Sequence, residues 1–257
     1  MTELLAYLER ARKDGRKLLV PYLVGGIPDK LAFADALRSV AKHADAVEVG
    51  LPFSDPLMDG PVIAAAAARA IAEGVGPFDA LELAADVDIA TPCVAMTYYN
   101  PVHRVGEAEF CRQAAEAGFA GLIVPDLPFE ESSSLVAAAA DFGLAWIPLV
   151  SPTSTTARVE AIVATATGFV YAVSTLGVTG TRERLSERAS AVASACKRAT
   201  DLPVLVGIGV STPAQAVEAS TEADGVVVGS AVVARVLEQG AQEAERFLGQ
   251  IRAALDG

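Results

Sequence analysis

The chain is poor in the residues that build metal sites, disulfides and nucleic-acid surfaces. Its 257 residues include three cysteines and two histidines, and 20 basic side chains stand against 32 acidic ones, a formal net charge of −12. The cysteines are widely spaced and odd in number, which predicts reduced, buried thiols. Because no basic run occurs, nucleic acid and anionic membranes are poor candidate partners. We expect no metal site and no partner of either kind.

Long hydrophobic runs and several catalytic motifs are also missing. No apolar stretch reaches the roughly 20 residues of a membrane span, and residues 1–17 form a charged amphipathic pattern without a signal-peptide core. None of the five lysines lies at the C-terminal end of a predicted strand, which argues against Schiff-base chemistry. No G-x-S-x-G motif occurs. We therefore expect a cytoplasmic protein that binds no cofactor.

Hydrophobic residues make up 52% of the chain and gather in short runs separated by helical patterns. Several runs are continuous rather than alternating, as is typical of parallel strands buried on both faces. Amphipathic helices are predicted between them, for example at 106–118 and 130–143, and both of these end at a glycine. The predicted strands are residues 17–24, 45–50, 93–99, 121–126, 145–150, 168–174, 203–209 and 225–230.

Eight strands alternating with helices predict an α/β fold, a (β/α)8 TIM barrel, with residues 1–257 as a single domain. A doubly wound open sheet is the main alternative, but the "GGIPD" that follows the first strand lacks a G-x-G-x-x-G spacing. Two segments exceed a minimal barrel: an N-terminal helix, and a helix at 61–74 after the second strand. Catalytic residues of such a barrel are expected at the C-terminal ends of its strands.

Glu48 is a carboxylate inside the second predicted strand. Val47 and Val49 flank it, so by strand alternation they point to one side and Glu48 points to the other. If the valines face the helices, Glu48 faces the barrel interior, where lost solvation raises the pKa of a carboxyl group and suits it to proton transfer. The alternative is a structural glutamate that pairs with an arginine or caps a loop.

Asp55 and Asp59 follow in the loop "LPFSDPLMDGP". Aspartates beside proline and glycine often serve turns, and Asp59 stands where it could cap the helix at 61–74. A loop of this length can also fold over the barrel mouth and bring a second carboxylate to face Glu48. The residues alone leave both interpretations of Asp59 open.

The loops after the last three predicted strands favour a phosphate site. They carry Gly180, Gly209 and Gly229, and Ser230 opens a short helix. Barrels often bind phosphate with the loops after strands seven and eight and a helix N-terminus, where free N–H groups converge. Tyr22, Tyr98 and Tyr171 lie near strand ends and are candidate pocket residues, although packing explains such tyrosines equally well. The residues together indicate proton transfer on a phosphorylated small molecule.

The chain resembles the tryptophan synthase alpha subunit family over essentially its whole length. The motifs that carry the resemblance are "PYLVGGIPD" (21–29), "EVGLPFSDPLMDGP" (48–61), "VPDLPFEES" (124–132), "SPTSTTAR" (151–158), "YAVSTLGVTG" (171–180), "VGIGVST" (206–212) and "VVVGSAVV" (226–233). The second motif is nearly diagnostic of the family by itself.

The resemblance implies cleavage of indole-3-glycerol phosphate to indole and glyceraldehyde 3-phosphate, a retro-aldol reaction of tryptophan biosynthesis. By motif, Glu48 is the acid/base at indole C3 and Asp59 is the carboxylate that faces the indole N–H. The phosphate site of the family maps to Gly180, Gly209, Gly229 and Ser230. Its substrate-contacting tyrosine is Tyr171, and Tyr22 is the aromatic residue at the end of strand one. Thr179 matches the threonine that contacts the Asp59 loop on closure.

The resemblance also implies a partner, a pyridoxal-phosphate beta subunit in a tetramer of two alpha and two beta chains. The cofactor belongs to that partner, and Asp55 becomes an interface residue. One departure is Thr175, which stands where many relatives carry arginine. Two alternatives remain open: a free-standing indole-3-glycerol-phosphate lyase with the same catalytic residues, and a non-catalytic allosteric subunit that binds a phosphate ligand.

Overall fold

A parallel β-barrel forms the centre of the molecule in the computed structural model, which describes residues 1–173, 182–207 and 209–257. Every strand pairing is parallel, and the strand order is β5-β4-β3-β2-β1-β9-β8-β7-β6. The strands are β1 (Leu18–Val24), β2 (Val47–Gly50), β3 (Cys93–Met96), β4 (Gly121–Ile123), β5 (Ala145–Trp146), β6 (Leu149–Val150), β7 (Val170–Val173), β8 (Val204–Gly207) and β9 (Gly225–Val228).

The predicted strand at 145–150 closes the ring of strands. Its first half, β5, pairs with β4, and its second half, β6, pairs with β7. Only Ile147 and Pro148 separate the halves, and they continue the pairing: the Ile147 N–H donates to the Leu122 carbonyl at 3.1 Å, and the Tyr171 N–H donates to the Pro148 carbonyl at 3.1 Å. Strands β5 and β6, which stand at the two ends of the strand order, therefore act as one strand that closes the barrel. All eight predicted strands are confirmed.

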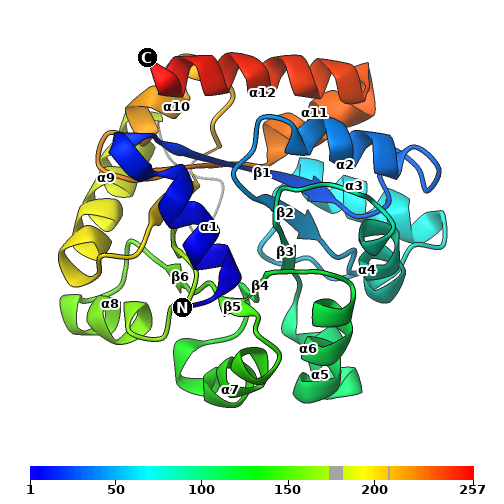
Figure 1. Ribbon diagram of the computed structural model, residues 1–257, viewed down its shortest axis with the longest axis horizontal. Helices are drawn as coiled ribbons and strands as arrows, with labels where there is room; N and C mark the ends of the chain where they lie inside the picture. The colour runs from blue at the N-terminus through cyan, green and yellow to red at the C-terminus, as the bar shows by residue number, and fades with distance from the viewer. Residues whose placement is uncertain (174–181, 208) are drawn as a thin grey trace.

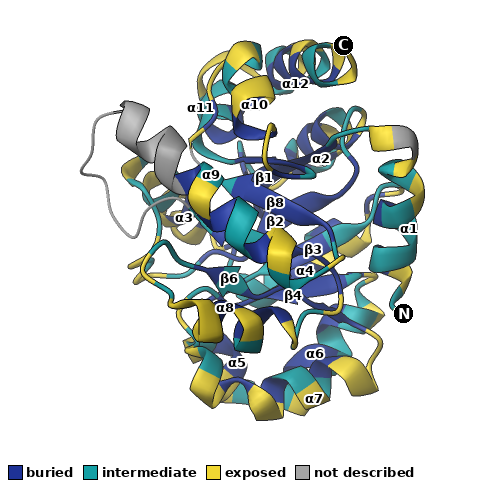
Figure 2. Cartoon of the chain, turned by 90° about the vertical axis from the view of Figure 1, so that its left-hand side faces the viewer, coloured by how far each residue is buried: buried dark blue, intermediate teal, exposed yellow. Residues whose placement is uncertain are grey.

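Helices surround the strands on the outside (Figure 1). Strand residues are mostly buried, whereas the exposed residues gather on the outer faces of the helices (Figure 2). In chain order the helices are α1 (Glu3–Ala11), α2 (Phe33–Ala41), α3 (Pro61–Ala72), α4 (Pro77–Ala85), α5 (Tyr99–Val105), α6 (Glu107–Glu116), α7 (Ser133–Asp141), α8 (Thr156–Val163), α9 (Arg182–Ala199), α10 (Pro213–Ala219), α11 (Ser230–Gln239) and α12 (Ala241–Asp256).

Alternation along the strands separates an inner core from an outer one. Val47 and Val49 lie in the outer core, with the apolar faces of the helices. Ala46 belongs to the inner cluster, together with Val20 on β1 and Val94 on β3. Residues two apart on a strand share a face, so Glu48 follows Ala46 into the barrel.

Helix α1 is the extra N-terminal helix that the sequence predicted. It closes the N-terminal end of the barrel. The hydroxyl of Thr2 accepts the Leu5 N–H at its start. Leu4 and Leu8 are fully buried in the inner cluster. The Leu4 side chain packs so close to Gly121 that a Cβ there would lie 3.1 Å from its Cδ2. Burying each leucine contributes about 2 kcal/mol.

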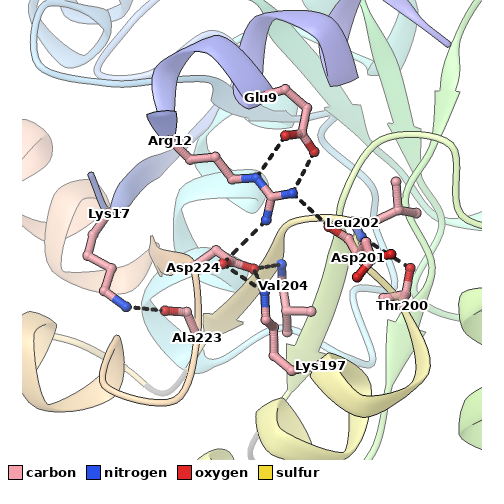
Figure 3. Close-up of polar contacts among 10 residues, drawn as sticks. All are labelled: Glu9, Arg12, Lys17, Lys197, Thr200, Asp201, Leu202, Val204, Ala223 and Asp224. Carbon is pink, nitrogen blue, oxygen red and sulfur yellow. Dashed lines mark hydrogen bonds and ion pairs between the residues drawn. The ribbon is translucent and has the colours of Figure 1, made fainter. Parts of the chain in front are cut away.

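A polar network holds this end of the barrel together (Figure 3). Asp224, just before β9, lies 3.4 Å from the Arg12 guanidinium and 2.9 Å from the Lys197 ammonium, and it accepts the Val204 N–H at 2.8 Å. Glu9 on α1 binds the other edge of Arg12, with a shortest contact of 2.6 Å. The network joins α1 and α9 to the starts of β8 and β9.

The extra helix after strand two is confirmed as α3. The strand expected at 93–99 is shorter than predicted, because β3 ends at Met96 and α5 begins at Tyr99. The Asp126 carboxylate accepts the Tyr99 N–H at 2.8 Å, which supplies a partner for a free donor in the first turn. Pro101 also lies in that turn, where a proline is tolerated because no intrahelical N–H bond is lost there.

Candidate active site

Glu48 lies inside the C-terminal half of the barrel. It is paired in register with Tyr22 of β1 and Val94 of β3, and only 1% of it is exposed. Its Oε1 has no hydrogen-bond partner among the described residues. Burial raises the pKa of Glu48 to about 8. A buried carboxyl group with a free oxygen is suited to exchange a proton with a bound molecule near neutral pH.

Asp59 reaches the same space from the loop that follows β2. Helix α3 starts at Pro61, and Gly60 is its N-cap with no side-chain capping bond, so Asp59 does not cap this helix. Burial raises the pKa of Asp59 to about 6, and a hydrogen bond from Tyr98 opposes that rise. The two carboxyl groups therefore differ in acidity while they face one site.

Glu48 and Asp59 line one cavity of about 200 Å³ at the C-terminal ends of the strands. Among the residues that the structure describes, no lysine or arginine lines it. A larger hollow of about 600 Å³ beside α1 lies at the opposite end of the barrel, and its lining brings no two carboxylates together. The smaller cavity is lined by Tyr22, Glu48, Met58, Asp59, Gly60, Ile63, Met96, Pro125, Leu149, Tyr171, Val173, Gly207, Gly209, Val227, Gly229 and Ser230.

Three of the four predicted phosphate residues lie at this cavity: Gly209, Gly229 and Ser230. Helix α11 begins at Ser230 with Gly229 as its N-cap, so its first N–H groups point toward the cavity end of the helix. Gly209 has a φ of +71°, a conformation that favours glycine. Gly180 lies outside the described residues, as do Thr179 and Thr175.

Tyr22 and Tyr171 stand in the cavity wall close to the two carboxyl groups. Burial, and then the nearby Asp59 and Glu48 charges, raises the pKa of both phenols well above 10. Both hydroxyls therefore stay protonated and can donate hydrogen bonds. The ring of Tyr22 lies over Gly50 and that of Tyr171 over Gly207, where an added Cβ would lie 1.9 Å and 2.6 Å from the phenol oxygens.

Gly50 and Gly207 are site residues that the sequence reasoning missed. Each ends a strand beside the strand that carries the tyrosine, and the lack of a side chain leaves room for the ring. The signal was present for Gly207, because it ends the strand that leads to the predicted phosphate residue Gly209.

Comparisons with known proteins identify the family of the chain. A family model described as "Tryptophan synthase alpha chain" matches residues 8–255. The tryptophan synthase alpha chain of Synechocystis is 43% identical over 263 residues, covering 99% of this chain and all of that one. The chain belongs to the tryptophan synthase alpha chain family. The family is one of lyases and serves tryptophan biosynthesis.

Solved structures of the alpha chain family share the fold. Tryptophan synthase from Mycobacterium tuberculosis superposes with a TM-score of 0.91 at 41% identity, covering 99% of this chain and 98% of the other. The alpha subunit of Legionella pneumophila superposes with a TM-score of 0.90 at 33% identity over 100% and 99% of the two chains. The barrel prediction is thereby confirmed.

The other two predicted site residues, Tyr98 and Asp55, lie away from the cavity wall. Tyr98 is buried behind the Asp59 loop, stacks on Phe53 with ring centroids 5.3 Å apart, and accepts the Met58 N–H at 2.9 Å. It is not among the residues that line the cavity. Asp55 is exposed on the outside of the loop, where it accepts the Ser54 hydroxyl at 2.6 Å.

The described part of this alpha chain offers no obvious place for a metal ion. No group of three histidine, cysteine or acidic side chains comes together there. Cys111 and Cys196 are buried, Cys93 is half-buried, and all three are free thiols, as predicted. No described helix is both long enough and apolar enough to cross a bilayer.

Proposed function

We propose that this chain cleaves indole-3-glycerol phosphate to indole and glyceraldehyde 3-phosphate, a carbon–carbon lyase reaction, with Glu48 and Asp59 as its catalytic residues. The observation that carries the proposal is the convergence of two carboxyl groups and the N-terminus of α11 on one cavity. The helix end offers N–H groups to a phosphate, and the apolar wall suits an indole ring.

The proposed reaction begins with Glu48 in its protonated form. Because its pKa is about 8, the group is mostly protonated at neutral pH. It donates its proton to C3 of the indole ring, and the ring becomes cationic. Without that proton the aromatic carbon is a poor leaving group.

Asp59 then stabilises the cation. With a pKa of about 6 it is mostly ionised at neutral pH, so its carboxylate accepts the indole N–H and faces the positive charge. The Glu48 carboxylate removes the proton of the substrate hydroxyl, whose oxygen forms the aldehyde as the carbon–carbon bond breaks. The bonding electrons return to the ring, and Glu48 ends in the protonated state in which it began.

The proposal also assigns residues to substrate binding and to loop closure. Gly180, Gly209, Gly229 and Ser230 bind the phosphate, Tyr22 and Tyr171 contact the substrate, and Thr179 takes part in loop closure. The chain itself needs no cofactor for this acid/base chemistry. We infer a cytoplasmic complex of two alpha and two beta subunits, in which pyridoxal phosphate belongs to the beta subunit.

The experiment that tests the function measures indole released from indole-3-glycerol phosphate by the purified chain, with and without a beta subunit. Glu48→Gln should lower turnover by roughly 10²–10⁴-fold and leave the binding of glycerol 3-phosphate unchanged. Glu82→Gln, which alters an exposed glutamate on α4, is the matched control. Undiminished turnover in Glu48→Gln would remove Glu48 from the mechanism.

The two alternatives give different results in the same assay. A free-standing lyase would release indole at a rate that the beta subunit does not change. A non-catalytic subunit would bind the phosphate ligand and release no indole. The paired carboxyl groups in the cavity favour a catalytic chain over the second alternative.

A further inference from the structure

Tyr98 holds the loop that carries Asp59 through two adjacent contacts. Its hydroxyl oxygen accepts the Met58 N–H at 2.9 Å, which places it beside the residue that precedes Asp59, and it interacts with the Asp59 carboxyl group. A phenol has one proton to give while its oxygen accepts the Met58 N–H, and the neighbouring Asp59 carboxylate is an acceptor for that proton. Burial raises the pKa of Tyr98, which keeps the proton on the phenol oxygen.

The tyrosine is itself held in place from three sides. Its ring is 6% exposed and stacks on Phe53 at an interplanar angle of 29°. Along the chain, Tyr98 lies between two regular elements, because β3 ends two residues before it and α5 begins one residue after it. Asp126, from the loop after β4, accepts the first N–H of α5 at 2.8 Å. The hydroxyl is therefore presented from a fixed position to a loop that lies outside the sheet.

We propose that Tyr98 is a positioning residue whose hydroxyl binds the Asp59 carboxylate and orients it toward the cavity. This inference rests on the proposed role of Asp59 in the reaction. It gives Tyr98 a different task from the substrate contact expected from the sequence, because the hydroxyl is committed to the loop and the ring to Phe53.

Other titratable groups also face Asp59, and each would push its pKa in a known direction. Glu48 from β2 is an acid in the same cavity and, when ionised, disfavours a second negative charge. Tyr22 from β1 and Tyr171 from β7 are neutral phenols that interact with Asp59. Tyr98 is the group with a hydrogen bond that lowers the Asp59 pKa. Removing its hydroxyl should therefore raise that pKa.

The test is a titration of the Asp59 carboxyl carbon by ¹³C NMR in the full chain, with Asp59→Asn used to assign the signal. Tyr98→Phe keeps the ring on Phe53 and removes the hydroxyl. Tyr99→Phe is the matched control, because it removes a neighbouring tyrosine hydroxyl that bonds Glu107 at 2.9 Å instead. We expect the Asp59 pKa to rise by roughly one to two units in Tyr98→Phe and to stay near 6 in Tyr99→Phe.

Kinetics supply the second measurement. In Tyr98→Phe the acid limb of kcat/KM for indole release should move upward by the same shift, while Tyr99→Phe keeps the wild-type profile. An unchanged Asp59 pKa in Tyr98→Phe, or an equal rise in both variants, would overturn the inference. If the wild-type chain releases no indole, the proposed function fails, and the NMR titration still decides the role of Tyr98.

Discussion

Glu48 and Asp59 are chemically similar side chains whose surroundings give them different acidities. Glu48 lies on a strand, walled by apolar neighbours, and its pKa rises to about 8 because burial disfavours the charge. Asp59 is on a loop, is less deeply buried, and receives a hydrogen bond, so its pKa rises only to about 6. At neutral pH the pair thus supplies one acid and one carboxylate, the division of labour that the proposed reaction needs.

The pH dependence of the rate should show both groups. We expect kcat/KM for indole release to fall below about pH 6, as Asp59 gains a proton, and above about pH 8, as Glu48 loses one. The measurement is a pH–rate profile from pH 5 to 9.5. The substrate phosphate also titrates near pH 6, so the residual activity of Asp59→Asn shows which part of the acid limb belongs to Asp59. A rate that is flat up to pH 9 would contradict the assignment of Glu48.

The same burial predicts a pH-dependent stability. The folded-state pKa of Glu48 is raised, so its contribution is fully present below its unfolded value of 4.5 and is lost as the pH rises through about 8. Between pH 6.5 and 8, where Asp59 is already ionised, this costs on the order of 1 kcal/mol per pH unit. Urea unfolding at these two pH values should show a smaller decrease for Glu48→Gln than for the wild-type chain. An equal decrease in both would show that Glu48 is not responsible.

At the scale of elements, the two ends of the barrel have different tasks. Helix α1 and the Asp224 network close the N-terminal end. The loops after β2, β4, β8 and β9 contribute to the site at the other end, which is where barrel enzymes place their chemistry. Helix α11 packs on the core along its body, and its first turn faces the cavity.

Removing one buried leucine of α1 should destabilise the chain without touching the site. Leu8→Ala should lower the free energy of unfolding by roughly 2–5 kcal/mol, because the side chain is fully buried at the closed end of the barrel. Leu31→Ala, at a leucine that is 93% exposed, is the matched control and should change it by less than about 0.5 kcal/mol. Urea unfolding measures both, and equal stabilities of the two variants would show that α1 is not part of the cooperative core.

At the scale of the whole molecule, the net negative charge and the position of the site indicate where a partner would dock. The chain carries a net charge of −12. Asp55 and Leu57, which is 88% exposed, lie on the outside of the Asp59 loop and so next to the mouth of the site. We propose that the chain is one domain and that a beta subunit docks at this end of it.

A charge reversal at Asp55 should weaken docking and spare the chemistry. Asp55→Lys should lower the apparent affinity for a beta subunit by roughly an order of magnitude, while the rate of indole release by the isolated chain stays the same. Asp88→Lys makes the same charge change at an exposed site before β3, at the opposite end of the barrel. Titration of beta subunit into the indole assay measures the affinity. Equal effects of the two variants would show that Asp55 has no special place in the interface.

Local patterns in the sequence were sufficient for much of the fold. Continuous apolar runs predicted all eight strands of the barrel, and the alternation of Val47, Glu48 and Val49 predicted that Glu48 points to the opposite side from the two valines. These features depend on the period of two in a strand, which is the same whatever the rest of the chain does. The boundary at β3 was misjudged, because it depends on Asp126, a residue far along the chain that starts α5.

What the sequence by itself determined is the barrel, the opposite orientations of Glu48 and its flanking valines, and the family to which the motifs point. The resemblance gave Asp59 and Asp55 different roles, but only the tertiary structure placed Asp59 at the cavity and Asp55 on the exposed outside of the same loop. It also placed the Tyr98 hydroxyl on the Met58 N–H of that loop. The physical reason is that a loop has no period of its own, and its course is decided by contacts such as Tyr98 with Met58, between residues 40 positions apart.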